Sequence, residues 1–325
     1  MHDDRTELPT RRGLLATLAD LTKFRLNALV VMTTVAGFVV AGAVPGATQS
    51  WTVLGWCVLG TACAAASAAI LNQVLEAAPD ALMQRTAGRP LPTGRVRRLS
   101  AWVLALALGY AGFAILAGFV NLLAAGLAVG NIVLYAAVYT PLKRYTTLNT
   151  VVGAITGALP PMIGWAAATG ELTAGAWVIG GVLFLWQMPH FLALAWMLRD
   201  DYRRGGFAML PSRDPDGALT GAASLATSLL LVPVGLLGVQ VGAAGFVYAI
   251  VAVLAGAALS LLALRFAQQR THARARTLFL ASLAYLPIVL GAMCADRGAV
   301  SVGAAFRGGA VNVPEAAPRE PPVDA

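Results

Sequence analysis

Nine long apolar runs, separated by shorter polar stretches, set the pattern of this chain. They cover residues 26–44, 51–72, 99–117, 121–140, 148–168, 173–198, 218–237, 241–264 and 277–294. A helix that crosses a bilayer needs about twenty predominantly apolar residues, and each run is long enough for one crossing. The pattern therefore predicts an all-α, polytopic membrane protein with nine transmembrane helices. Composition agrees, because only 12% of the residues are charged, against roughly 25% in soluble domains.

Basic residues alternate with the apolar runs. Those before position 297 occupy the N-terminal segment and every second polar stretch: Arg5, Arg11, Arg12, Lys23, Arg25, Arg85, Arg89, Arg95, Arg97, Arg98, Lys143, Arg144, Arg199, Arg203, Arg204, Arg213, Arg265, Arg270, Arg274 and Arg276. The intervening stretches have none. Because Lys and Arg accumulate on the cytoplasmic side, we expect a multi-pass protein of the bacterial plasma (inner) membrane with a cytoplasmic N-terminus and an external C-terminus.

This orientation divides the chain into three parts. Residues 1–25 are expected to form a cytoplasmic segment, residues 26–294 the nine-helix domain, and residues 295–325 a disordered external tail. The acidic loops at about 73–98 and 199–217 would then lie inside. The net charge of +8 is mostly an orientation signal, and partly an attraction for membrane lipid or an anionic substrate. A nucleic-acid partner is not implied.

Two short segments indicate an internal duplication. T-K-F-R-L-N at residues 22–27 precedes the first apolar run, and K-R-Y-T-T-L-N at residues 143–149 precedes the fifth. The offset of about 120 residues superposes Lys23 on Lys143, the only lysines in the chain. A parallel four-helix duplication is therefore predicted, with the ninth helix as an extra. The same offset carries Asp80 onto Asp200, which places both acidic clusters on one membrane face.

The first acidic cluster lies in residues 72–92, where the second apolar run ends. Asn72, Glu76 and Asp80 are four residues apart, so on a helix they form one polar stripe. Two acids at this spacing repel each other unless a divalent cation or a basic partner neutralises them. We interpret the stretch as a metal and phosphate site, and ordinary helix-end polarity is the alternative. Pro79 is expected to kink the helix or to start a new one.

Basic residues suited to a phosphate group flank that cluster. Arg85 and Arg89 follow it by one or two turns, and Lys143 and Arg144 follow the fourth apolar run. Arginine binds phosphate oxygens as a fork and lysine as a point charge. The four residues are candidates for a wall around a diphosphate. Lys143 and Arg144 could instead serve only as membrane anchors.

The second acidic cluster follows the sixth apolar run. Asp200 and Asp201 lie among Arg199, Arg203 and Arg204, so the alternative is a mutually neutralised loop at the membrane surface. Because its repeat-related partner carries similar side chains, we interpret it as the second half of one site. Mg²⁺ is commonly held by one or two carboxylates together with substrate phosphates, which suits both clusters.

His190 is the one ionisable side chain predicted well inside a span. It precedes Asp201 by eleven residues, and the other histidines, His2 and His272, are far from it in sequence, which argues against a zinc site. A buried histidine often has only a hydrogen-bonding role. The functional alternative is that His190 faces a cavity and holds a bulky substrate, as an iron ligand or as an orienting group.

Four segments carry a resemblance to a known family. They read N-x-x-x-E-x-x-x-D-x-x-M-x-R-T-x-x-R-P-L-P at 72–92, Y-T-P-L-K-R at 139–144, G-A-L-P-P-M-I-G-W at 157–165, and W-Q-M-P-H-F followed by D-D-Y-x-x-G-G-F-A-M-L-P within 186–211. Together they resemble the protoheme IX farnesyltransferase (haem O synthase) family, a branch of the UbiA-type intramembrane prenyltransferases. The resemblance covers about residues 20–295.

The resemblance implies nine helices around a lateral cavity, Mg²⁺ as cofactor, and transfer of the farnesyl group of farnesyl diphosphate to a vinyl group of haem B. A haem A synthase would act downstream. The catalytic acids would be Asp80, Asp200 and Asp201, and the metal set Asn72, Glu76, Asp80, Asp200 and Asp201. The diphosphate set would be Arg85, Arg89, Lys143 and Arg144. From the residues themselves we further expect Arg203 in the diphosphate set and His190 at the haem. This chain has Glu76 where the superfamily has Asp, and adjacent Asp200 and Asp201 where relatives often space their acids.

Two other functions fit parts of the pattern. A prenyltransferase acting on an aromatic quinone precursor would share the first motif and differ mainly in residues 186–211. A secondary transporter would place polar groups near the middle of the membrane and interrupt corresponding helices of both halves. The acids here gather at one face, and the proline pair at 160–161 has no counterpart in the first span, which favours the enzyme.

Overall fold

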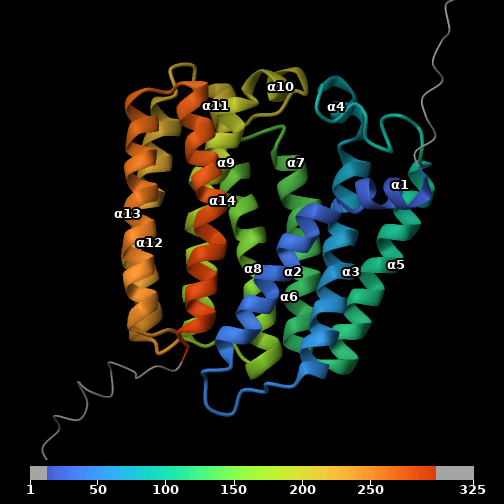
Figure 1. Cartoon of the computed structure of the whole chain (residues 1–325). Coiled ribbons are helices and arrows are strands. Elements are labelled where there is room, and N and C mark those ends of the chain that lie inside the picture. The colour runs from blue at the N-terminus through green and yellow to red at the C-terminus, as the bar shows by residue number, and fades with distance from the viewer. Residues whose placement is uncertain (1–12, 298–325) are drawn as a thin grey trace, which may run out of the picture.

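The computed structural model describes residues 13–297 and contains nine long apolar helical spans in that part of the chain. The spans are α2 (Phe24–Ala41), α3 (Trp51–Leu75), α5 (Arg98–Phe119), the fourth span at Leu122–Leu142, α8 (Asn149–Thr169), α9 (Ala174–Met197), α12 (Ala218–Gln240), α13 (Phe246–Gln268) and α14 (His272–Ala295). The predicted all-α architecture with nine membrane-crossing helices is confirmed for the described residues (Figure 1). The tail predicted to be disordered lies almost wholly outside them.

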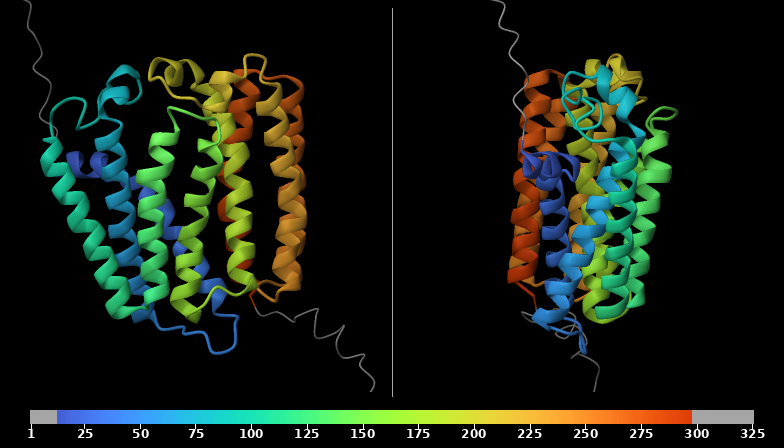
Figure 2. Two further views of the ribbon diagram at one scale, coloured as in Figure 1. Left: turned by 180° about the vertical axis from the view of Figure 1, so that it is seen from behind. Right: turned by 90° about the vertical axis from the view of Figure 1, so that its right-hand side faces the viewer.

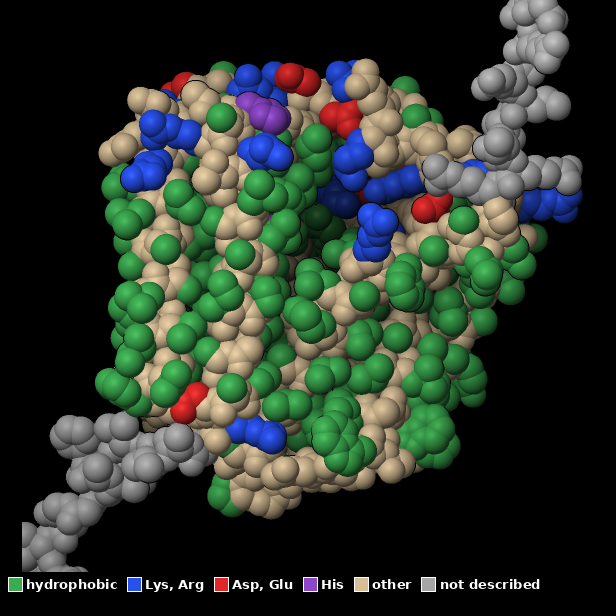
Figure 3. Space-filling model, viewed as in Figure 1, with side chains coloured by type: hydrophobic (Ala, Val, Ile, Leu, Met, Phe, Trp, Pro, Cys, Tyr) green, Lys and Arg blue, Asp and Glu red, His purple; other side chains and the backbone are tan. Residues whose placement is uncertain are grey.

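Four short helices gather toward one end of the bundle. They are α1 (Leu14–Leu21), α4 (Ala77–Leu82), α10 (Arg199–Arg204) and α11 (Leu210–Arg213). Figures 1 and 2 show α4, α10 and α11 at this end, level with the ends of α13 and α14, whereas α1 lies crosswise to the long helices. Most basic side chains visible in Figure 3 are at this end, and apolar side chains cover the flanks. We call it the polar end of the bundle.

The fourth span changes its helical geometry partway along. It begins as α6 (Leu122–Val133), continues as the π-helix η1 (Leu134–Tyr139) and closes as α7 (Thr140–Leu142). π-Helical turns are uncommon and are found frequently at functional sites. Here the π-helix ends at Tyr139, four residues before Lys143.

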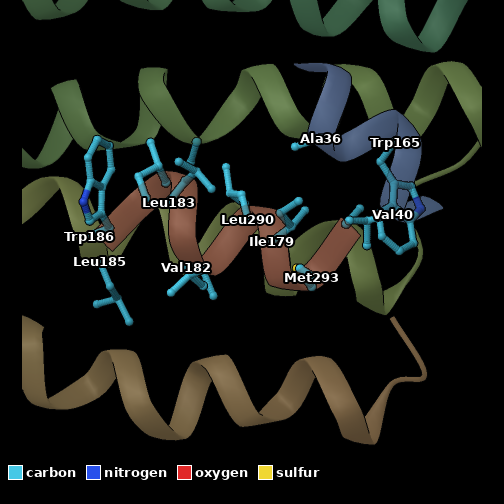
Figure 4. Packing of buried hydrophobic residues seen from close by; sticks show 14 of the residues in the cluster. Ala36, Val40, Trp165, Ile179, Val182, Leu183, Leu185, Trp186, Leu290 and Met293 are labelled. Atoms are coloured by element: carbon cyan, nitrogen blue, oxygen red, sulfur yellow. The ribbon is translucent and has the colours of Figure 1, made fainter. Parts of the chain in front are cut away.

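The core forms where α8 and α9 meet α2 and α14. Figure 4 shows side chains of α9, among them Ile179, Leu183 and Trp186, packed toward these neighbours. Glycines let the backbones approach, because a Cβ on Gly164 would overlap the carbonyl of Thr34, and one on Gly157 the amide of Gln187. Small residues at such contacts are typical of helices that pack in lipid.

Prolines lie inside α8 and α9 without dividing either helix. Pro160 and Pro161 are in α8, and Pro189 is in α9. Gln187 of α9 donates from Nε2 to the backbone oxygens of Ala154 at 3.3 Å and Leu183 at 3.0 Å, so α8 and α9 are joined at mid-span. The duplication inferred from sequence stays a prediction. Contacts between consecutive helices do not test it, because such helices pack against one another in any up-and-down bundle.

Candidate active site

A cavity of about 220 Å³ opens at the polar end, where α3 passes into α4. Its walls come from the start of α2, from α3 and α4 with the loop after them, from the end of the fourth span, and from α10 with the segment after it. The lining residues are Lys23, Leu26, Asn72, Glu76, Asp80, Met83, Arg85, Arg89, Tyr139, Lys143, Tyr202, Phe207 and Met209. Figure 3 shows basic side chains gathered around a hollow near this end.

The predicted stripe of Asn72, Glu76 and Asp80 lines this cavity. α3 ends at Leu75, Glu76 is the junction, and α4 begins at Ala77. The new helix thus begins before Pro79, which lies in the first turn, where a missing N–H is tolerated. All three stripe residues are at most 4% exposed. Despite the break between α3 and α4, the three stripe residues therefore lie on one side and face the same cavity.

Each acid of the stripe has a basic partner within hydrogen-bonding distance. Lys143 Nζ donates to Glu76 Oε1 at 2.8 Å, and Arg89 donates to Asp80 Oδ2 at 2.6 Å. Buried charges are costly unless they are paired in this way. Asp80 Oδ1, however, is enclosed and has no partner among the described residues. The site therefore retains one buried carboxylate oxygen available to a ligand.

Asn72 is held from two sides. Lys23 Nζ donates to its Oδ1 at 2.6 Å, and its Nδ2 donates to Thr140 Oγ1 at 3.0 Å. Thr140 follows the π-helix and donates in turn to the carbonyl of Tyr135 at 2.8 Å. The irregular end of the fourth span thus orients a side chain of α3 within the cavity.

Both lysines of the chain belong to the cavity wall. Lys23 was missed as a site residue in the sequence, although its match to Lys143 across the proposed repeat was a usable signal. It has φ 51°, the only positive φ outside glycine in residues 13–297, and this conformation is uncommon for a lysine. The backbone strain accompanies a side chain directed to Asn72.

The two lysines differ in electrostatics. Burial, and then the positive charges of Arg89 and Lys143, lower the pKa of Lys23 to about 7. Burial acts in the same direction on Lys143, but the charge of Glu76, the neighbouring phenols of Tyr139 and Tyr135, and the hydrogen bond to Glu76 together raise the pKa of Lys143 above its usual value. Lys143 also lies 4.4 Å from the ring centre of Tyr139, a cation–π distance. Lys143 is therefore firmly cationic, whereas Lys23 gains most from an added anion.

The second acidic cluster is arranged differently. Asp200 is 72% exposed in its side chain and pairs with Arg203 at 3.3 Å. Asp201 is buried and accepts from the backbone N–H of Gln84 at 2.9 Å and from Arg204 at 2.7 Å. Burial opposes ionisation of Asp201, but these hydrogen bonds hold its pKa below the usual value. Asp201 thereby ties α10 to the loop that carries the cavity's arginines.

The structure brings together only part of the predicted site. Asn72, Glu76, Asp80, Arg85, Arg89 and Lys143 line one cavity, and Asp200, Asp201, Arg144, Arg203 and His190 do not. Arg144 is exposed, and Asp200 and Arg203 bind each other at the surface. The catalytic and metal-binding roles of these residues stay predictions.

The cavity suits a metal cation that is held partly by a ligand bound in the same cavity. Within residues 13–297, no three acidic, histidine or cysteine side chains are grouped so that they could bind a metal by themselves. Glu76 and Asp80 nevertheless line the same cavity, and Asp80 keeps an unpartnered oxygen. One or two carboxylates plus phosphate oxygens from a substrate are the usual ligands of Mg²⁺. The residues present therefore fit a magnesium ion that arrives with a phosphorylated ligand.

Comparisons with known proteins bear on the family and the fold. The family model of the UbiA prenyltransferase family matches residues 30–305. The chain is 41% identical over 286 residues to protoheme IX farnesyltransferase of Solibacter usitatus, covering 86% of this chain and 97% of that protein. It is 43% identical over 281 residues to protoheme IX farnesyltransferase of Salinibacter ruber, covering 85% and 96%. The solved structure of a UbiA homolog from Archaeoglobus fulgidus bound to DMAPP and Mg2+ shares the fold, with a TM-score of 0.63, 15% identity and coverage of 85% and 99%.

Proposed function

Because this chain belongs to the UbiA prenyltransferase family, we propose that it transfers the farnesyl group of farnesyl diphosphate to a vinyl group of protoheme IX (haem B), giving haem O. The observation that carries the chemistry is the cavity in which two lysines and two arginines surround buried Glu76 and Asp80. The identity of the acceptor is supported by relatives of that name that are similar over nearly the whole chain.

The leaving group is assigned to the polar end of the cavity. The C–O bond of farnesyl diphosphate breaks, its electron pair stays on the diphosphate, and an allylic cation remains. Lys23, Lys143, Arg85 and Arg89 stabilise the negative charge on the departing diphosphate, which lowers the barrier because that charge develops in the transition state. Mg²⁺ held by Glu76 and Asp80, together with the diphosphate, would supply further charge neutralisation.

The apolar side of the cavity protects the cation. Met83, Phe207 and Met209 pack together, and Ala195 of α9 lies against them. Tyr139 and Tyr202 add aromatic rings to the same lining. These side chains offer polarisable surfaces to the cation, and they limit the access of water that would quench it.

The acceptor then captures the cation. The vinyl group of haem B supplies two π electrons to form a new C–C bond with the farnesyl carbon, and positive charge moves to the vinyl carbon next to the macrocycle. A water molecule adds at that carbon and loses a proton, which gives the hydroxyethyl-farnesyl side chain of haem O. Haem O is then the substrate expected for a haem A synthase downstream.

The orientation inferred from sequence completes the proposal. With the polar end cytoplasmic, farnesyl diphosphate reaches the cavity from the cytoplasmic face of a bacterial inner membrane, and the C-terminus is external. Reporters fused after Gly94 and Asp214 should respond as cytoplasmic, and one fused after Ala299 as external. A cytoplasmic C-terminus would overturn this orientation.

The direct test uses the purified protein, or membranes that contain it, incubated with haem B, farnesyl diphosphate and Mg²⁺. Extraction and mass spectrometry should find haem O only when both substrates are present. An aromatic quinone precursor such as 4-hydroxybenzoate serves as the competing acceptor, because that activity is the alternative within the superfamily. Farnesylation of the aromatic acid without any haem product would overturn the assignment.

A further inference from the structure

A histidine outside the cavity is held in an unusually ordered setting. His190 lies on α9, and its ring stacks on Trp186 at 5.2 Å and on Phe279 of α14 at 4.8 Å between ring centres. Two aromatic rings therefore pack against the imidazole, one from α9 itself and one from α14. Trp186 is itself fixed, since its indole N–H donates to the carbonyl of Ser282 at 2.6 Å. These contacts fix the orientation of the imidazole.

The hydrogen bonds determine which nitrogen carries the proton. His190 Nδ1 lies 2.9 Å from Ser282 Oγ, and that hydroxyl donates its one hydrogen to the carbonyl of Phe279 at 2.7 Å. Ser282 Oγ can then only accept from the imidazole. In the neutral ring the proton is therefore on Nδ1, and Nε2 carries a lone pair. A partner that fixes the tautomer in this way is typical of metal-binding histidines.

Nε2 is also accessible. It makes no hydrogen bond to residues 13–297, and it is not among their enclosed polar atoms that lack a partner. His190 as a whole is only partly exposed, so neighbouring side chains surround the site at which Nε2 can be reached. α9, which carries His190, packs against both α14 and α2.

The position suits the acceptor of the proposed reaction. Ala195, which packs against the cavity residues Met83, Phe207 and Met209, is five residues beyond His190 on α9, or about 7.5 Å along the helix axis. A macrocycle bound through its central metal at His190 would extend by several ångströms in its own plane. Its rim could therefore approach the cavity while its centre stays deeper in the membrane.

We propose that Nε2 of His190 binds the iron of the haem substrate, and that Ser282 is the positioning residue that keeps Nδ1 protonated and Nε2 free. Trp186 and Phe279 hold the imidazole plane so that its lone pair points out of the stack. This inference rests on the proposed function, because it names how the same reaction holds its acceptor.

The test compares two porphyrins that differ only in the metal. Purified protein without farnesyl diphosphate is titrated with haem B and with metal-free protoporphyrin IX. The wild-type protein should bind haem B at least tenfold more tightly than metal-free protoporphyrin IX. Binding should also shift the Soret band of haem B. His190→Ala should lose both the preference and the shift. Ser282→Ala should weaken haem binding by about 10- to 100-fold, as loss of a ligand's orienting partner does, with protoporphyrin affinity unchanged.

Controls separate this outcome from misfolding and from failure of the proposed function. His272→Ala, which removes the exposed histidine at the start of α14, should behave as wild type. Farnesyl diphosphate affinity should be unchanged in all three variants, and added imidazole should restore the Soret shift to His190→Ala. If the wild-type protein makes haem O but its haem spectrum matches that of His190→Ala, the inference about His190 is wrong and the proposed function still holds. A wild type that produces no haem O would overturn the proposed function instead.

Discussion

The segment around Asp80 and the segment around Asp201 carry similar side chains just after the ends of α3 and α9, yet they occupy different environments. Around Asp80 the acids are buried and line the cavity; Asp80 pairs with Arg89, nine residues further along, and Glu76 pairs with Lys143 from the end of the fourth span. Around Asp201 the ion pairs form within α10 itself, between residues three apart.

The difference lies in where the compensating charge comes from. Short-range pairs on an exposed helix contribute little to stability and bring nothing new together. Pairs between distant segments at a buried site hold those segments around a common space, and removal of one partner leaves a charge unsatisfied. We therefore place the diphosphate at the Asp80 segment, and we assign the Asp201 segment to holding the loop at residues 83–89.

The largest effect is expected for Asp80→Asn. The change keeps the side-chain volume but removes the charge that pairs with Arg89 and the oxygen available to a cation. Turnover of farnesyl diphosphate and haem B should fall on the order of 100-fold or more, as for loss of a group that stabilises transition-state charge. Steady-state kinetics on detergent-purified protein measures the loss, and retained helical circular dichroism shows that the fold survives. Near-normal turnover would contradict the placement.

Lys143→Met should come next. It removes one of two cationic lysines and leaves Glu76 buried without its partner, so both catalysis and thermal stability should decline, turnover by tens-fold. Lys23→Met is the matched control within the cavity, because its partner Asn72 is neutral. That variant should weaken diphosphate binding with a smaller loss of melting temperature. Equal melting temperatures would refute the role given to the Lys143–Glu76 pair.

Asp201→Asn should have an intermediate effect. The amide oxygen can still accept from Gln84, but the charge facing Arg204 is lost, which should cost about 1 kcal/mol of stability. The loop carrying Arg85 and Arg89 becomes less constrained, so we expect kcat/KM to fall by about tenfold through a higher KM. A loss as large as that of Asp80→Asn would break the comparison, because it would make Asp201 a ligand rather than a brace.

Asp200→Asn should have the smallest effect. Its carboxylate is mostly exposed and contacts only Arg203 among the described residues, so turnover should stay within about twofold of wild type. An inactive but folded Asp200→Asn protein would show that α10 closes over the substrate and that the predicted five-residue metal set assembles at that stage.

Sequence reasoning succeeded where one physical signal dominated. The nine membrane-spanning helices could be predicted from the nine apolar runs, because a bilayer imposes a length on each helix. The four-residue spacing of Asn72, Glu76 and Asp80 correctly placed these three side chains on the same side of the chain. It could not show that Asp200 points outward, because adjacent aspartates face different directions on a helix and the sequence does not say which is buried.

The remaining differences depend on tertiary contacts. Lys23 enters the cavity through a left-handed backbone conformation that no local pattern indicates for lysine. The tautomer of His190 depends on Ser282, a residue 92 positions away in the chain. Such pairings arise from how helices pack, and spacing along one helix carries no information about them.

The central claim is that the Asp80 cavity binds a prenyl diphosphate together with Mg²⁺. Isothermal titration of purified protein with farnesyl thiodiphosphate, a slowly reacting analogue, tests it directly when the same preparation is measured with Mg²⁺ and after removal of divalent metal by EDTA. We predict binding that weakens at least tenfold without the metal, and an affinity in Asp80→Asn that is low and insensitive to Mg²⁺. Identical affinity in the presence and absence of Mg²⁺, in wild type and variant alike, would contradict the account.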